Sequence, residues 1–162
     1  MSKPIVYVVD GDRQVLAAVE ALLDTAGYSA RCFLSPQGLL SYRRRAHEAC
    51  VVIDLADPGV DAKGFMHELR TQGRHLPVIL ATFLFDPTLA HRWLEQGVFA
   101  VVEKPFDADD FLATIEQALN LSTLATVCCS LKSLAACGSP AGESPSYPQS
   151  PSESPRDPGR CP

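Results

Sequence analysis

Residues 50–54 read Cys-Val-Val-Ile-Asp, and the turn-forming sequence Leu-Ala-Asp-Pro-Gly follows at 55–59. An apolar run of this length before a turn is typical of a strand buried on both faces, as in parallel sheets. Asp54 then stands at the carboxyl end of the strand, where open α/β sheets bind their ligands. This stretch therefore predicts the fold class and the place of a functional site.

Three other apolar runs end in polar residues in the same way. They lead to Asp10-Gly11-Asp12, to Thr82, and to Glu103-Lys104-Pro105. Because the carboxyl ends of parallel strands lie at one edge of the sheet, these side chains are expected near Asp54. Carboxylates, a hydroxyl and a lysine at one edge can bind a divalent cation and a phosphoryl group.

Amphipathic segments separate the apolar runs. The pattern predicts strands at 5–9, 28–33, 50–54, 78–82 and 98–102. It predicts helices at about 13–26, 36–46, 63–72 and 108–119, and a further helix that starts at Pro87 and stops at Gly97. Five alternating strands and helices predict a doubly wound (βα)5 parallel-sheet sandwich of the α/β class, with helices on both faces.

The composition changes after residue 120. Residues 140–162 hold seven of the thirteen prolines, mixed with Ser, Gly and Glu. Such a segment buries too little apolar surface to offset its ordering entropy. We therefore expect one folded domain at 1–120 and a Ser/Pro-rich, disordered tail at 121–162 without an output domain. The moderately apolar piece 121–137 could extend the last helix by a turn or two.

Charge and hydropathy exclude several classes of function. The net charge of −5 argues against direct nucleic-acid binding, which needs clustered Lys and Arg. No run of 18 apolar residues exists, and the N-terminus lacks the form of a signal peptide, so a cytoplasmic protein without a membrane partner is expected. Cys32 and Cys50 lie in apolar contexts and are expected to be reduced core residues.

Strand end by strand end, residues 4–120 resemble the receiver (CheY-like) domain of two-component response regulators, in particular the NarL/FixJ type. The matching residues are Val8-Val9-Asp10, Asp54 with Pro58, Leu76-Pro77-Val78-Ile79, Thr82 and Glu103-Lys104-Pro105-Phe106. The resemblance implies a CheY/flavodoxin-like fold and a phosphorelay signalling module rather than an enzyme. A sensor histidine kinase would be its partner.

The resemblance also implies a role for each site residue. Asp54 would be the phosphoacceptor, Thr82 would bind the phosphoryl oxygen, and Lys104 would pair with the phosphate or with Asp54. The bond before Pro105 would be cis, which proline tolerates. Mg²⁺ would be held by Asp10, Asp12, Asp54 and the backbone carbonyl of Ala56. Homodimerisation through the fourth helix, fifth strand and fifth helix would be a readout.

The sequence departs from the family at several positions, which leaves alternatives open. Gly11 replaces the usual second acid, so that Asp12 is either a metal ligand or the N-cap of the first helix. Asp57 either offsets the lost charge or repels a phosphoryl donor. Val101 stands where an aromatic switch residue is usual. An atypical pseudo-receiver that binds a partner without metal or phosphate is therefore the alternative function.

Other features allow two interpretations each. Phe83-Leu84-Phe85 is either an exposed apolar patch for a partner or a segment folded over the core. Trp93 is expected to pack half-buried rather than to anchor an interface. The tail fits a stand-alone receiver or a reading-frame shift that replaced an output domain. A hydrolase or flavin domain is disfavoured because neither G-x-S-x-G nor G-x-G-x-x-G occurs.

Overall fold

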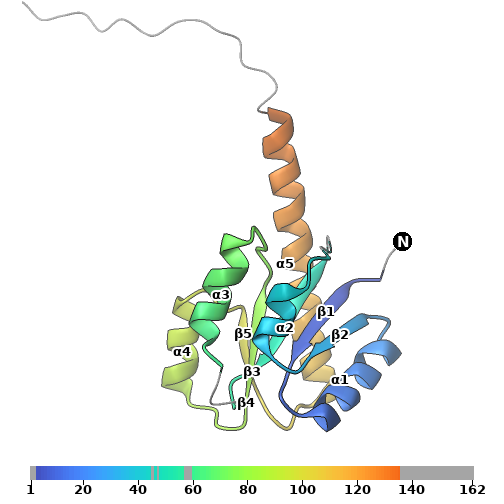
Figure 1. Cartoon of the computed structure of the whole chain (residues 1–162), viewed down its shortest axis with the longest axis vertical. Coiled ribbons are helices and arrows are strands. Elements are labelled where there is room, and N and C mark those ends of the chain that lie inside the picture. Colours follow the sequence, from blue (N-terminus) through green and yellow to red (C-terminus); the bar gives the residue numbers. More distant parts are fainter. Residues whose placement is uncertain (1–2, 45, 47, 57–59, 136–162) are drawn as a thin grey trace, which may run out of the picture.

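The structure is a computed structural model that describes residues 3–44, 46, 48–56 and 60–135, with side chains up to residue 125. Strands and helices alternate along this part of the chain (Figure 1). The elements are β1 (Ile5–Val9), α1 (Arg13–Thr25), β2 (Ser29–Phe33), α2 (Pro36–Ser41), β3 (Ala49–Asp54), α3 (Ala62–Thr71), β4 (Val78–Thr82), α4 (Pro87–Glu95), β5 (Ala100–Glu103) and α5 (Ala108–Ala135). Apart from the ends of α2 and α5, these bounds agree with the predicted ones within two residues.

The five strands form one parallel sheet in the order β2-β1-β3-β4-β5. The chain passes from β1 to β2 on one side and then crosses to β3 on the other. The sheet therefore has its topological switch point between β1 and β3, where ligands bind in folds of this kind. Asp10 and Asp54 lie at the carboxyl ends of these two strands. The predicted doubly wound (βα)5 sandwich is confirmed.

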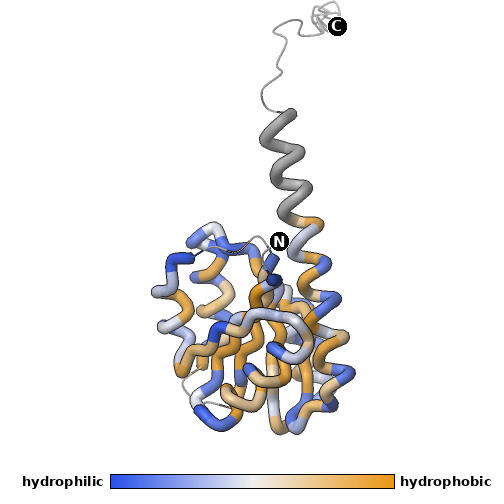
Figure 2. The backbone as a smooth tube through the Cα atoms, turned by 90° about the vertical axis from the view of Figure 1, so that its right-hand side faces the viewer, coloured by the Kyte–Doolittle hydropathy of each residue, from blue (hydrophilic) through white to orange (hydrophobic). Residues whose placement is uncertain are grey.

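Helices cover both faces of the sheet, and each face has its own core. On one face α1 and α5 pack over Val6, Val8, Cys50 and Val52, and on the other α2 and α3 pack over Tyr7, Val9, Val51 and Ile53. Alternate residues of β1 and β3 thus point to opposite layers, as the two-residue period of a strand requires. Figure 2 shows the apolar residues concentrated in the centre of the fold.

The predictions for the buried cysteines and the tryptophan are confirmed. Cys50 is fully buried and Cys32 half-buried, and both are free thiols. Burial raises the pKa of the Cys50 thiol to about 12, so this thiol stays protonated and acts as a small apolar side chain. Trp93 packs half-buried against the α2/α3 core.

Helix α2 is shorter than predicted, because it ends at Ser41 instead of about Ala46. Its C-cap Tyr42 adopts an extended backbone with ψ 112°. The Nη1 of Arg74 donates hydrogen bonds to the carbonyls of Leu39 at 3.0 Å and Tyr42 at 3.4 Å. The Tyr42 ring lies against Tyr7 and Phe33. A buried arginine and an aromatic cluster therefore end the helix, and neither can be recognised in the local sequence.

Helix α5 is longer than predicted, because it continues past Leu119 to Ala135. No Gly or Pro occurs between Ala108 and Ala135, and the first breaker after the helix is Gly138. Ser122 is buried, and its Oγ accepts a hydrogen bond from the amide of Ala49 at 3.4 Å. The helix therefore continues past the change in composition at residue 120, and further than the turn or two that the apolar piece 121–137 suggested. Residues 136–162 of the tail that is expected to be disordered lie outside the described part.

None of the helices in the described part of the chain combines the length and the apolar character that a membrane span requires.

Candidate functional site

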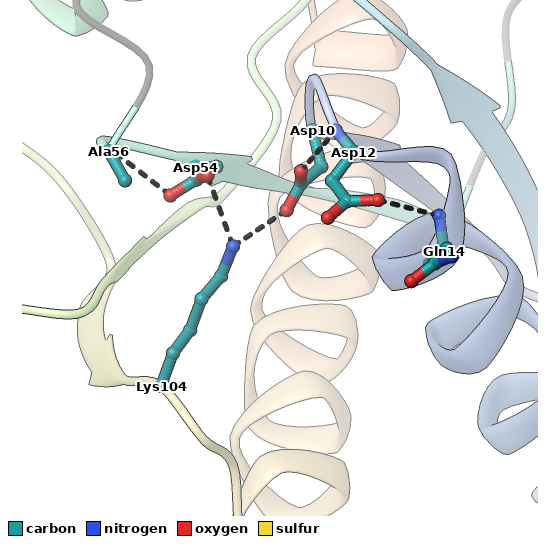
Figure 3. A network of polar contacts seen from close by, with 6 residues as sticks. All are labelled: Asp10, Asp12, Gln14, Asp54, Ala56 and Lys104. Atoms are coloured by element: carbon teal, nitrogen blue, oxygen red, sulfur yellow. Dashed lines mark hydrogen bonds and ion pairs between the residues drawn. The ribbon is translucent and has the colours of Figure 1, made fainter.

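One lysine joins two acids at the switch point of the sheet. The Nζ of Lys104 lies 2.6 Å from Asp10 Oδ2 and 3.1 Å from Asp54 Oδ2 (Figure 3). The three side chains are only 5%, 5% and 10% exposed for Lys104, Asp10 and Asp54. Charges this deeply buried are stable only when they are paired and hydrogen-bonded. We call these three residues the acid–lysine triad; its formal charge is −1.

The strands place both acids on the same side of the sheet. Val8 and Val52, two residues before Asp10 and Asp54, point into the layer of α1 and α5. The two-residue period directs the carboxylates the same way, and both line a small cavity with Val15 and Val19 of α1. The alternation that buries the core therefore also brings the two acids together.

Lys104 is positioned by the end of β5. Its amide donates to the carbonyl of Thr82 at 2.7 Å, which continues the pairing of β4 and β5 by one residue. The Lys104–Pro105 peptide bond is cis, in agreement with the expectation. The ring of Phe106 then stacks on Phe111 of α5, with 4.4 Å between ring centroids and 10° between planes. Contacts on both sides of Lys104 thus fix the loop that carries it.

Backbone amides satisfy the remaining oxygens of the two acids. Asp10 Oδ1 accepts a hydrogen bond from the Asp12 amide at 2.8 Å, and Asp54 Oδ1 accepts one from the Ala56 amide at 2.9 Å. Both are Asx-type turns, in which the side chain bonds the backbone two residues on. Ala56 contributes its N–H in this contact. The predicted metal ligand is the Ala56 carbonyl oxygen, which this hydrogen bond does not involve, so its role stays a prediction.

Asp12 is the N-cap residue of α1, one of the two roles expected for it. It has extended backbone angles, φ −98° and ψ 115°, and its carboxylate accepts a hydrogen bond from the Gln14 amide at 2.8 Å. Figure 3 shows this carboxylate turned towards α1. Within the described ranges, no three His, Cys, Asp or Glu side chains are grouped as metal ligands. The structure therefore brings Asp10 and Asp54 together but leaves Asp12 on the helix cap.

Thr82 reaches the same edge of the sheet, but its hydroxyl bonds Leu84 and none of the three side chains of the triad. Its Oγ1 accepts a hydrogen bond from the Leu84 amide at 3.1 Å and donates one to the Leu84 carbonyl at 3.2 Å. The next three side chains are exposed: Phe83 by 56%, Leu84 by 85% and Phe85 by 43%. The exposure predicted by one of the two interpretations is therefore present, whereas binding of a partner to this loop stays a prediction.

Sequence reasoning missed one contact of the site. The Nζ of Lys104 lies 5.1 Å from the ring centroid of Phe83, within the range of a cation–π interaction. An aromatic residue directly after Thr82 was the only signal for it. Val101, at the usual position of an aromatic switch, is half-buried on β5. Pro58, part of the resemblance, and Asp57, one of the departures from the family, lie outside the described residues.

Comparison with known proteins supports the same family along most of the chain. The profile of the response regulator receiver domain matches residues 6–116. The transcriptional regulatory protein FixJ of Bradyrhizobium diazoefficiens is 30% identical over 118 residues, which cover 73% of this chain and 58% of FixJ. The chain thus spans little more than half the length of this relative.

Solved structures share the fold. The response regulator StyR superposes with a TM-score of 0.73 at 27% identity and covers 82% of this chain and 67% of StyR. The N-terminal domain of FixJ superposes with a TM-score of 0.65 at 22% identity and covers 74% of this chain and 96% of that domain. The strand order, the CheY-like architecture and the matched profile agree. The chain belongs to the response regulator receiver domain family.

Proposed function

We propose that Asp54 accepts a phosphoryl group from a sensor histidine kinase and that the chain is the phosphoacceptor module of a two-component system. The observation that carries this proposal is the buried pairing of Asp54 with Lys104 and Asp10 at the switch point. A receiver domain is a signalling module rather than a classical enzyme. Its chemistry is the transfer of one phosphoryl group to its own side chain.

The transfer exchanges one bond for another. A carboxylate oxygen of Asp54 attacks the phosphorus of a phosphohistidine, the new O–P bond gives an acyl phosphate, and the N–P bond breaks. The imidazole nitrogen leaves with the electron pair and takes up a proton. Such a transition state needs in-line positioning and neutralisation of charge more than covalent assistance. Lys104, already 3.1 Å from Asp54, supplies a positive charge at the place where negative charge arrives.

Thr82 would hold the phosphoryl group after transfer. Its hydroxyl is bonded to Leu84 in this structure, so it must rotate to donate to a phosphoryl oxygen on Asp54. The residue thus has two alternative partners, and phosphorylation favours one of them. A ligand shifts such an equilibrium only by its different affinity for the two states.

The donors of the site fit Mg²⁺ in their chemistry. Carboxylate oxygens are the ligands this ion prefers, and Asp10 and Asp54 already converge on one cation, the ammonium of Lys104. Asp10, Asp54, Asp12 and the Ala56 carbonyl would hold the ion. The small cavity that the two acids line, about 10 Å³, has mostly apolar walls and is too small for a hydrated ion. When bound, Mg²⁺ supplies further charge neutralisation during phosphoryl transfer.

The readout would be a change on the surface of α4, β5 and α5, including formation of a homodimer. Leu89 and Leu94 of α4 are exposed by 47% and 45% and offer apolar area on this surface. Sedimentation of the phosphorylated and the unmodified chain compares their masses directly, and equal masses would exclude the dimer.

We further propose that residues 1–120 form the receiver domain and that the protein works in the cytoplasm. Fractionation of cells tests the localisation.

Incubation with acetyl phosphate and Mg²⁺ is expected to give a phosphorylated species that a phosphate-affinity gel separates from the unmodified chain. Asp54→Asn should abolish that species, because the amide has no carboxylate oxygen to attack phosphorus. The matched control is Asp61→Asn, which changes an exposed carboxylate at the N-cap of α3. A band that survives in Asp54→Asn would place the modification elsewhere and contradict the proposal.

Gly11→Asp is expected to tighten Mg²⁺ binding about tenfold, since affinity for this ion rises with the number of charged ligands. Gly11 is not among the described glycines with positive φ, which are Gly27, Gly73 and Gly97, so an aspartate fits the backbone. Calorimetric titration with MgCl₂ measures the dissociation constant. Gly11→Asn is the neutral control of similar shape. Equal affinities of the aspartate and asparagine variants would show that the ion does not bind beside Asp10.

The alternative is a pseudo-receiver that binds a partner without metal or phosphate. One observation favours it: Lys104 already neutralises the acids, and the Asp12 carboxylate is engaged on the cap of α1. A folded protein that gives no phosphorylated species with acetyl phosphate or with a histidine kinase would support this function instead.

A further inference from the structure

The ammonium of Lys104 is enclosed by three groups. Asp10 and Asp54 take two of its sides through ion pairs, and the ring of Phe83 lies 5.1 Å from the nitrogen on another. Phe83 is 56% exposed, whereas the side chain of Lys104 is 5% exposed. The ring therefore contacts both solvent and the buried ammonium. A positive charge in contact with the face of an aromatic ring is stabilised by the quadrupole of the ring.

The position of Phe83 is linked to the hydroxyl of Thr82. Thr82 Oγ1 bonds both backbone groups of Leu84, which closes a tight turn with Phe83 at its centre. A hydroxyl has one proton, so Thr82 cannot donate to the Leu84 carbonyl and to a phosphoryl oxygen at the same time. Rotation of Thr82 towards Asp54 must therefore break this donation and loosen the turn that holds the ring.

We propose that Phe83 is a positioning residue that holds Lys104 between Asp10 and Asp54, and that it leaves Lys104 when Thr82 turns from Leu84 to a phosphoryl group. This inference rests on the proposed function and adds an aromatic reporter for it. Val101 has no ring at the position where the family has its aromatic switch, and Phe83 supplies a ring at another place. Release of the ring changes the exposed patch of Phe83, Leu84 and Phe85.

NMR of the lysine side chains tests the contact in the resting protein. The chain has four lysines, so ¹³C-labelled lysine gives few signals, and Lys104→Arg identifies the one of interest. The ring current should shift the Hε signal of Lys104 upfield. Phe83→Leu keeps an apolar side chain but should abolish the shift, whereas Phe83→Tyr should retain it. Phe85→Leu, a neighbouring exposed ring, is the matched control and should leave the signal unchanged.

Addition of acetyl phosphate and Mg²⁺ tests the release. The Lys104 signal of the phosphorylated wild-type protein should lose its upfield shift, with the phosphorylated fraction measured on the same sample by gel. The proposal is overturned if wild type and Phe83→Leu share one Lys104 signal, or if phosphorylated protein keeps the resting shift. If no phosphorylated species forms, the proposed function and the release step both fail. The comparison with Phe83→Leu still decides the resting contact by itself.

Discussion

Lys104→Met will lower the free energy of unfolding by about 3–5 kcal/mol, because it removes the only cation of the acid–lysine triad and leaves two buried carboxylates facing each other. The methionine nearly fills the volume of the lysine stem, so the loss reports charge rather than packing. Urea unfolding followed by the fluorescence of the one tryptophan, Trp93, measures the change.

The matched variant is the double substitution Asp10→Asn with Lys104→Met. It removes one carboxylate together with the lysine and leaves one buried charge instead of two. Its stability should lie between those of the wild type and Lys104→Met, which shows that repulsion of Asp10 and Asp54 causes the loss. A single Lys104→Met variant as stable as the wild type would mean that the triad is solvated and not buried as described.

The stability of Lys104→Met in the presence of Mg²⁺ provides a second measurement. Without the competing ammonium, Asp10 and Asp54 carry two uncompensated charges, so the folded state should bind the ion more tightly. A ligand that binds only the folded state raises stability in proportion to the logarithm of its concentration over its dissociation constant. The unfolding midpoint of Lys104→Met should therefore rise more with MgCl₂ than that of the wild type. Equal increases would argue against metal binding between these acids.

Local sequence predicts most of the fold because its signals are strong and short-range. The buried run at 50–54 and the proline-marked helix starts at Pro36 and Pro87 appear in the structure where they are predicted. The carboxyl ends of the parallel strands also predict that Asp10 lies near Asp54, and both acids contact the same lysine in the structure. Where only neighbouring residues determine an element, one sequence is enough.

The errors arise where a distant residue decides. Arg74, which is distant in sequence, bonds the carbonyls at the end of α2, and no pattern within 36–46 reveals it. The part of α5 beyond Leu119 includes a hydrogen bond between Ser122 and Ala49, which are far apart in the sequence. Asp12 has two possible partners that local sequence cannot rank, and the structure places it on the helix cap.

Phe83 shows the same limit within the site. A loop residue after a strand has no periodicity, so its sequence context does not say whether the ring faces solvent, core or Lys104. The structure shows that it faces solvent and Lys104: more than half of the residue is exposed, and its ring contacts the ammonium. Contacts of this kind depend on the three-dimensional meeting of β4 and β5, which the order of residues alone does not give.

Phe111→Ala will lower the free energy of unfolding by about 3–5 kcal/mol, the usual cost of truncating a buried phenylalanine. Phe111 is 1% exposed in the core between α1 and α5. Its ring also stacks on Phe106, two residues after Lys104. Chemical denaturation measures the loss. Leu124→Ala, a truncation of a 67% exposed residue on the same helix, should change stability by no more than about 0.5 kcal/mol.

The stack also links the core to the site, which gives Phe111→Ala a second effect. Without Phe111 the ring of Phe106 loses its stacking partner on α5. The loop that carries Lys104 is then held on its other side by the hydrogen bond from the Lys104 N–H to the Thr82 carbonyl. Hydrogen exchange at Lys104 and Phe106 should accelerate more than global destabilisation explains, whereas exchange in β1 and β3 should follow the global loss. Uniform acceleration across the fold would mean that Phe111 supports the core alone. A selective effect would show that the position of the lysine beside Asp54 depends on a ring stack outside the site.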